Sequence, residues 1–393
     1  MKNIGTVSYG VKAPIIRPGD DLVEITVDSV MKAVKEAKIK LKDRDIVAVT
    51  EAIVAKSQGN FATVDDIASD VRSKMGEGTI GVIFPILSRN RFSNILKAIA
   101  RGCDNLVIQL SYPFDEVGNP LVSIEKLYEL GITSFDKVFT DEKFYKLVGK
   151  IEHPFTGIDY IDAYKKICGD KCKVILSNDP TTILKYTKKV ISADIHSRFR
   201  NKNLLLKKGA KKVITLDEIL SKPVNGSGYN EKHGVLGSNL STDEKLKLFP
   251  RDTQVFVDKL QKRFKEECGV NIECMVYGDG AFKDPVGGIW ELADPVVSPA
   301  YTSGLNGTPN EIKLKFVADN QIANLTGKEA EKAMKEIISK KSKDLKNQNI
   351  SLGTTPRRIT DLLGSLADLT SGSGDKGTPI VLITGYFNNY ADE

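Results

Sequence analysis

Residues 46–50 read Ile46-Val47-Ala48-Val49-Thr50, and residues 272–277 read Ile272-Glu273-Cys274-Met275-Val276-Tyr277. The first run is short and rich in β-branched residues, which indicates a buried strand. The second run also indicates a strand, and it ends at Gly278-Asp279-Gly280. Upstream, Asp20 or Asp21 is a suitable N-cap for a helix, because a short carboxylate accepts hydrogen bonds from the first unpaired N–H groups.

Short apolar runs alternate with helical patterns between residues 80 and 225. The runs predict strands at 80–84, 106–110, 174–176 and 213–216. Helical spacing of apolar residues predicts helices at 93–100 and 182–190. This alternation is typical of an α/β unit with a parallel sheet.

Composition and charge exclude several classes of protein. The 393 residues carry 57 basic and 51 acidic side chains, a net charge of +6. The basic residues are interleaved with acids, so no nucleic-acid partner is expected. No window of about 18 apolar residues occurs, so no membrane span is expected. The N-terminus lacks the apolar stretch of a signal peptide and the cysteines are irregularly spaced, which together predict a cytoplasmic protein with reduced thiols.

The most informative polar segment runs from Tyr277 to Pro285 and contains Asp279, Lys283 and Asp284. An aspartate at the carboxyl end of a strand often faces a ligand crevice in α/β folds. Its oxygens suit Mg²⁺, which keeps substrate phosphates as further ligands. An ordinary Asp-Gly turn explains the same residues without any ligand.

Two further segments offer weaker candidates. Asp361 stands in an apolar helical pattern, where it is either a metal ligand or the partner of Arg357 or Arg358. Ser238 and Asn239 follow a glycine-containing segment and offer side-chain donors, although a turn is the commoner explanation of such a stretch.

In this order, the segments resemble the coenzyme F-420-0:L-glutamate ligase (F-420 gamma-glutamyl ligase) family, in particular its longer bacterial members. The matching segments run from Ile16 to Leu22, Asp45 to Gly59, His233 to Pro250, Tyr277 to Asp279 and Asp361 to Gly385. The resemblance implies an α+β core that carries a large α/β insertion. It divides the chain into a discontinuous ligase-like core, residues 1–80 with 226–393, and an inserted subdomain at 81–225.

The resemblance also implies an activity. The family is a GTP-dependent amide ligase that activates a carboxylate as an acyl phosphate, which the amine of L-glutamate then attacks. For this chain we therefore expect GTP or ATP as cosubstrate, Mg²⁺ or Mn²⁺ as cofactor, an F-420-0-like small carboxylate as acceptor, and a homodimer.

The resemblance assigns site residues by position. Asp279, Lys283 and Asp361 would be catalytic, and Asp279 and Asp361 would also be the metal ligands. The positions that it places at the nucleotide and its phosphates are Pro14, Ile16, Thr50, Glu51, Lys56, Ser238 and Asn239.

One departure keeps a second hypothesis open. The chain has Asp361-Leu362 where the family has an Asp-Glu pair. A non-catalytic nucleotide- or metabolite-binding regulatory protein on the same scaffold is the alternative.

Overall fold

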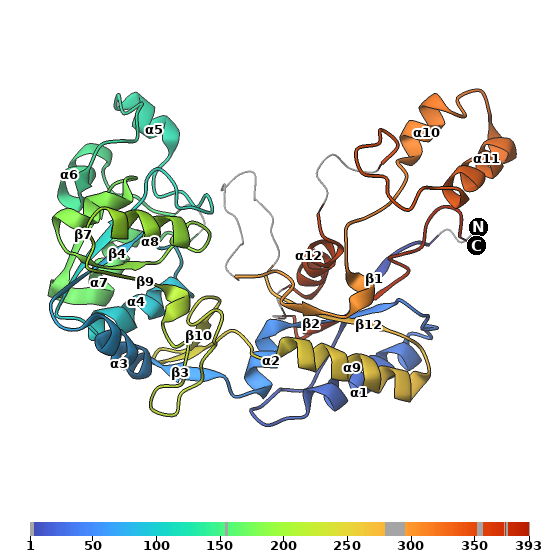
Figure 1. Cartoon of the computed structure of the whole chain (residues 1–393), viewed down its shortest axis with the longest axis horizontal. Helices are drawn as coiled ribbons and strands as arrows, with labels where there is room; N and C mark the ends of the chain where they lie inside the picture. The colour runs from blue at the N-terminus through green and yellow to red at the C-terminus, as the bar shows by residue number, and fades with distance from the viewer. Residues whose placement is uncertain are drawn as a thin grey trace.

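A computed structural model describes residues 4–153, 156–279, 295–351, 357–372, 374 and 376–392. Within these residues the strands form three sheets, and helices pack on the two larger ones (Figure 1). The fold class is therefore α+β, as expected.

The first sheet holds the strands nearest the two ends of the chain. Its order is β1 (Val7–Val11), β14 (Ile380–Thr384), β2 (Ile46–Thr50), β12 (Glu273–Tyr277) and β13 (Ala300–Tyr301). The strands β2 and β12 are parallel neighbours, and the other pairs are antiparallel. Every residue of β2 and β12 is buried, which explains why both strands are apolar at most positions, and both predicted strands are confirmed.

Helices cover both faces of this sheet. The helices α1 (Leu22–Glu36) and α9 (Thr253–Cys268) pack on one face, where Val30 and Phe264 meet Val49. Asp21 caps α1 by accepting hydrogen bonds from the N–H groups of Val23 and Glu24. The helix α12 (Ile359–Ser371) packs on the opposite face, where Leu363 joins a separate apolar cluster.

The second sheet has six strands. Their order is β6 (Phe139–Thr140), β7 (Cys172–Leu176), β5 (Asn105–Leu110), β4 (Thr79–Ile83), β8 (Lys189–Ser192) and β9 (Lys212–Thr215). All neighbours are parallel except β6 and β7. One face carries α3 (Val64–Met75), α4 (Phe92–Arg101) and α7 (Tyr160–Cys168), and the other carries α8 (Arg198–Lys207). The predicted α/β alternation is confirmed.

The helix predicted at 182–190 is wrong. A 3₁₀ helix occupies Pro180–Lys185, and β8 begins at Lys189. Val190 and Ile191 are β-branched and fully buried between β4 and β9, where strand pairing satisfies their backbone groups. Pairing and burial in the sheet therefore decide the structure of residues 189–190, although their apolar spacing also suits a helix.

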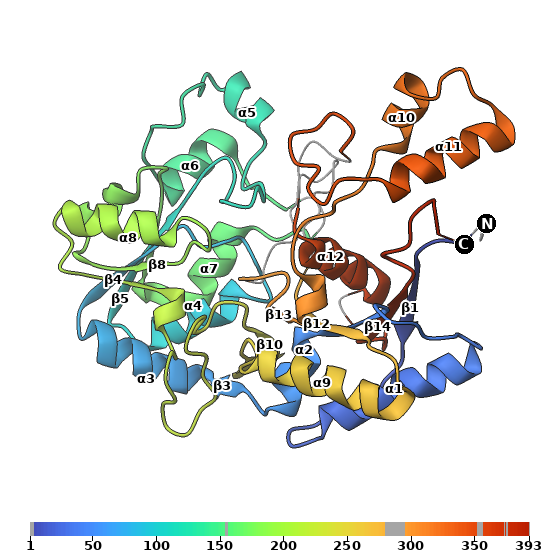
Figure 2. The same ribbon diagram turned by 45° about the vertical axis from the view of Figure 1, so that its right-hand side comes forward.

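A third, small sheet lies between the other two (Figure 2). It consists of β10 (Asn239–Thr242), β11 (Lys245–Lys247) and β3 (Phe61–Thr63). The chain leaves the first sheet through α2 (Glu51–Ser57) and β3, and it returns through β10 and β11. The Asn60 amide joins the two passages, because it donates to Phe249 O (2.8 Å) and accepts from Tyr229 N (3.0 Å).

The remaining helices lie at the periphery. They are α5 (Ile124–Glu129), α6 (Asp141–Val148), α10 (Leu314–Asn320) and α11 (Gly327–Ser339). The helices α10 and α11 share an apolar cluster of their own, which includes Val317, Met334 and Ile338. Within the described ranges, none of the helices has the length and apolar character that crossing a membrane requires.

The domain boundaries at 80/81 and 225/226 stay a prediction. The apolar core on the α3 and α4 side of the six-stranded sheet also includes Val64, Leu236 and Leu246, which lie outside residues 81–225.

Candidate functional site

Two sequence-predicted regions meet at the carboxyl ends of β2 and β12. Thr50 and Tyr277 are partners in the parallel register, so Glu51 lies one residue and Asp279 two residues beyond the end of its strand. The Tyr277 hydroxyl donates a hydrogen bond to Ser371 Oγ at the end of α12 (2.7 Å), and burial raises the pKa of this tyrosine. The contact between Tyr277 and α12 fixes the end of β12, two residues before Asp279.

The backbone just before Asp279 and the side chain of Asp361 both bond to the segment 297–298. The N–H of Gly278 donates to Val297 O (2.9 Å), and Ser298 Oγ donates to Asp361 Oδ1 (2.7 Å). Asp361 also accepts two hydrogen bonds from Arg358, at 3.0 and 3.1 Å. The sequence left open whether this aspartate binds a metal or pairs with an arginine, and the structure shows the arginine pair.

An arginine from the six-stranded sheet's side of the molecule reaches Asp279. Arg91 precedes α4, and its Nη2 forms an ion pair with Asp279 Oδ2. The two side chains are 12% and 23% exposed, so the pair is largely shielded from water. The preceding residue, Asn90, accepts a hydrogen bond from the N–H of Leu240 (3.2 Å), which anchors this loop beside Ser238 and Asn239.

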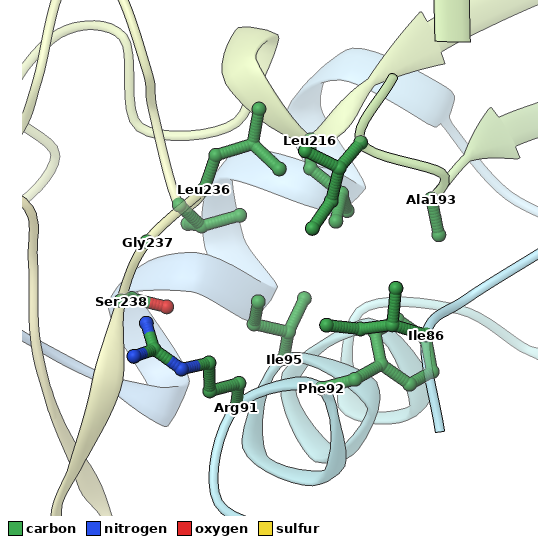
Figure 3. Close-up of a pocket in the computed structure, with 11 residues that line it drawn as sticks. Ile86, Arg91, Phe92, Ile95, Ala193, Leu216, Leu236, Gly237 and Ser238 are labelled. Carbon is green, nitrogen blue, oxygen red and sulfur yellow. The ribbon is translucent and has the colours of Figure 1, made fainter. Parts of the chain in front are cut away.

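Arg91 and Ser238 line one end of a cavity of about 20 Å³ (Figure 3). The other walls are apolar and include Ile86, Phe92 and Leu236. The volume is that of roughly one water molecule. Ser238 is 1% exposed, and its Oγ has no hydrogen-bond partner among the residues that the structure describes. An unsatisfied buried hydroxyl costs about 1–3 kcal/mol, and one water molecule in this cavity would satisfy it.

A buried ion pair stands next to the same sheet edge. Lys247 Nζ on β11 lies 2.5 Å from Glu51 Oε1 at the start of α2, and the two side chains are 11% and 7% exposed. Glu51 was predicted from the resemblance, whereas Lys247 and Arg91 were missed. Neither missed residue belongs to a recognisable motif, and only the folded chain brings them to this edge.

Other predicted positions lie further away. Gly19 N donates to Ser57 O (2.8 Å), which ties the loop of Pro14 and Ile16 to the far end of α2. That end is separated from Thr50 by the helix, whose seven residues span about 10 Å. Ile16 is buried in the core and Pro14 is exposed. Lys56 lies in the last turn of α2, and Asn239 begins β10.

Lys283 lies outside the described residues, so the structure does not place it. Among the described positions, Thr50 and Glu51 lie at the end of β2 and Asp279 lies just beyond the neighbouring β12. Arg91 contacts Asp279 and lines a cavity with Ser238, and Asp361 bonds to the segment that follows Val297.

The chemistry of these side chains fits a divalent cation accompanied by phosphates. Asp279 and Asp361 carry carboxylate oxygens, which are paired here with Arg91 and Arg358, and Ser298 adds a hydroxyl beside Asp361. The part of the chain that the structure describes holds no group of three His, Cys, Asp or Glu residues arranged as metal ligands. Magnesium does not need one, because it commonly takes one or two carboxylates and completes its shell with water and substrate phosphates.

Comparison with known proteins identifies the family. No curated protein matches the chain. A family model described as F420-0:gamma-glutamyl ligase matches residues 10–385, and so spans both larger sheets. The chain therefore belongs to the F420-0:gamma-glutamyl ligase family.

Proposed function

We propose that the protein is an NTP-dependent gamma-glutamyl ligase, which joins L-glutamate to a small-molecule carboxylate such as an F-420-0-like acceptor. Membership of the family supports ligase activity. GTP or ATP as cosubstrate, Mg²⁺ or Mn²⁺ as cofactor and a homodimeric assembly are parts of the proposal.

The observation that carries this proposal is the arrangement of Asp279 and Asp361 around residues 297–298. The two carboxylates belong to different elements, a strand end and a helix, and are 82 residues apart in sequence. Hydrogen bonds from Gly278 and to Asp361 bring both to one segment. Carboxylates near the carboxyl edge of a parallel strand pair suit the binding of a nucleotide together with its cation.

The proposed reaction has two steps. An oxygen of the acceptor carboxylate forms a bond to the γ-phosphorus, and the bond from that phosphorus to the nucleoside diphosphate breaks. The amine nitrogen of L-glutamate then bonds to the acyl carbon, the acyl carbon–oxygen bond breaks, and phosphate leaves as the nitrogen loses a proton. Bound Mg²⁺ or Mn²⁺ would supply neutralisation of the phosphate charge.

The side chains of this protein would bind and position the reactants. Asp279 and Asp361 would hold the cation. The Glu51–Lys247 pair is buried beside Thr50, and it would keep the start of α2 fixed relative to β11. A fixed edge matters because small displacements of reacting groups cost large factors in rate.

The test is calorimetric titration of the full chain with GTP and ATP, each with Mg²⁺ and with Mn²⁺, followed by glutamate-dependent phosphate release with F-420-0 as acceptor. We expect binding of at least one nucleotide–metal pair, and its loss in Asp279→Asn. The matched control is Asp217→Asn, because Asp217 also pairs with a half-buried arginine, Arg198, at 16% and 13% exposure.

Failure of every nucleotide–metal pair to bind the wild-type protein would refute the proposal. Nucleotide binding without glutamate-dependent phosphate release would instead favour the regulatory alternative. Size-exclusion chromatography with light scattering measures the assembly, for which we expect twice the mass of one chain.

A further inference from the structure

The carboxyl edge of the six-stranded sheet has the topology of a ligand site. Its parallel strands lie in the order β7-β5-β4-β8-β9, whereas the chain forms β4 first and then β5, β7, β8 and β9. The order therefore reverses beside β4. The chain leaves β4 for α4 on one face of the sheet and leaves β8 for α8 on the opposite face (Figure 2). In open α/β sheets, such a reversal leaves a crevice at the carboxyl ends of the strands, where ligands commonly bind.

A cavity of about 140 Å³ occupies this crevice. It accommodates several water molecules or a small organic molecule. The residues that line it come from the strand ends: Phe84 follows β4, Ser111 follows β5, and Asp194 lies two residues beyond β8. Phe84 has φ +52°, a left-handed conformation that a bulky residue adopts only where its surroundings impose it. Such strain is commonly found at ligand sites.

Three carboxylates line the cavity, those of Asp115, Glu116 and Asp194. Asp115 and Glu116 accept several hydrogen bonds from backbone N–H groups, so their oxygens are largely satisfied. Asp194 is 1% exposed and accepts only from Ser192 Oγ and Asn201 Nδ2, which leaves it further acceptor capacity. Within the described part of the chain, no basic side chain pairs with these three carboxylates. Burial accordingly raises the pKa of Asp194 to about 6.

Arg200 supplies the one positive charge of the described lining. It lies in the first turn of α8, is exposed, and donates from Nε to Asn201 Oδ1 (3.3 Å). It has no ion-pair partner among the residues that the structure describes. Its planar fork therefore remains available for a carboxylate. Phe84 and Phe114 add apolar surface, and Phe114 is 39% exposed.

Gln109 adds an independent observation. It is fully buried near the end of β5, and its carbonyl oxygen accepts from Phe84 N (2.9 Å). Its Nε2 donates to Ser177 O (3.0 Å) and Asp179 O (2.8 Å), on either side of Asn178, which lines the cavity. Its Oε1 has no hydrogen-bond partner among the described residues. The wall of the cavity therefore offers one more acceptor, which a ligand's donor group, or a water bound with it, would satisfy.

The charges decide which ligand fits. The described residues hold no group of three His, Cys, Asp or Glu arranged as metal ligands, which disfavours a divalent cation. Glu116 already accepts from the N–H groups of Ile195, His196 and Ser197, which would otherwise hold a phosphate. The excess of carboxylates favours an ammonium group, and the arginine favours a single carboxylate beside it.

We propose that this cavity binds an α-amino acid with a neutral or basic side chain, whose ammonium group contacts Asp194 and whose carboxylate pairs with Arg200. The ligand's side chain lies against Phe84 and Phe114. The inference goes beyond the proposed function, because none of the residues assigned to the ligase reaction lines this cavity. Either proposal can therefore fail without the other.

The test is thermal unfolding of the full chain with each standard L-amino acid, followed by calorimetric titration with those that raise the midpoint. At least one neutral or basic amino acid should bind, and its amine without the carboxylate should bind roughly 10-fold more weakly. Asp194→Asn should weaken binding roughly 10- to 100-fold, the range for a lost hydrogen bond to a charged group. Arg200→Ala should weaken it roughly 3- to 10-fold, because this side chain is exposed.

Matched controls exist for both variants. Asp45 is also a buried aspartate with a raised pKa, in the first sheet. Arg89 is an exposed arginine whose Nε donates to the next residue, Asn90, at 3.3 Å, as that of Arg200 does to its neighbour. Asp45→Asn and Arg89→Ala should bind the amino acid as the wild type does. Ser197→Phe would fill the cavity without removing a charge, and should abolish binding.

Four outcomes would overturn the proposal. The first is that no amino acid binds. The second is that binding persists in both Asp194→Asn and Ser197→Phe, which would place it elsewhere. The third is that the amine binds as tightly as the amino acid and Arg200→Ala has no effect, so that the carboxylate contact is wrong. The fourth is that L-glutamate or L-aspartate binds most tightly and Asp194→Asn removes that binding, which would contradict the charge reasoning.

Discussion

Replacing Lys247 with methionine should destabilise the protein by about 3–5 kcal/mol, the usual cost of removing one partner from a buried ion pair. Lys247 and Glu51 are 11% and 7% exposed, so water screens their interaction little, and Nζ lies 2.5 Å from Oε1. The lost charged hydrogen bond contributes about 1.5–3 kcal/mol of this cost. The rest arises because the Glu51 carboxylate stays buried without its cation.

Urea unfolding at neutral pH, followed by far-ultraviolet circular dichroism, measures this cost. The matched control is Lys245→Met on the same strand, because the exposed Lys245 ammonium lies over the Phe61 ring, 4.7 Å from its centroid. The control should lose less than about 1 kcal/mol. Adding Glu51→Gln to Lys247→Met should recover part of the loss, since the buried charge is then removed. A free energy of unfolding for Lys247→Met within about 1 kcal/mol of the wild type would refute the reasoning.

Two further predictions concern the region around the six-stranded sheet. Gly234→Ala should destabilise the protein by at least about 2 kcal/mol, because Gly234 has φ +51° and an added Cβ would meet Ile219 O at 2.3 Å. Thermal unfolding should show a lowered midpoint, and an unchanged midpoint would contradict this prediction. Burial raises the pKa of Asp194 from 3.8 to about 6, so the native state keeps a proton that the unfolded state has released. The free energy of unfolding should therefore fall as pH rises from about 4 to about 7. Asp194→Asn should remove up to about 3 kcal/mol of that fall, which urea titrations at several pH values would measure. If the free energy of unfolding of the variant depends on pH as that of the wild type does, this prediction is wrong.

The strands of the two larger sheets could be predicted because their burial leaves a direct mark in the sequence. The segments 46–50 and 273–277 are buried on both faces, so each is apolar at almost every position. The segment 182–190 fails for the opposite reason. It covers the end of a 3₁₀ helix and the first two residues of the four-residue strand β8, whose burial depends on pairing with β4 and β9.

The candidate site could be predicted only in part. Asp279 follows a recognisable strand end, so its place at the sheet edge follows from the local pattern. Arg91 precedes α4, which packs on the six-stranded sheet, and nothing in its neighbouring residues indicates that it contacts Asp279. Lys247 shows the same limit, because an alternating Lys-Leu-Lys strand predicts an exposed lysine and the fold buries this one. Such residues become visible only when the tertiary contacts are known.

The two passages of chain between the larger sheets restrict how those sheets can move. Besides the Asn60 contacts, the Gln58 amide donates to Arg251 O and accepts from Arg251 N at 2.9 Å, and β3 pairs with β11 in register. A single connecting strand would allow twisting about its own axis, whereas two cross-bonded strands resist torsion and leave bending as the easy motion. Bending about this ribbon would stretch the Arg91–Asp279 ion pair, so that pair opposes the one motion that the ribbon leaves easy.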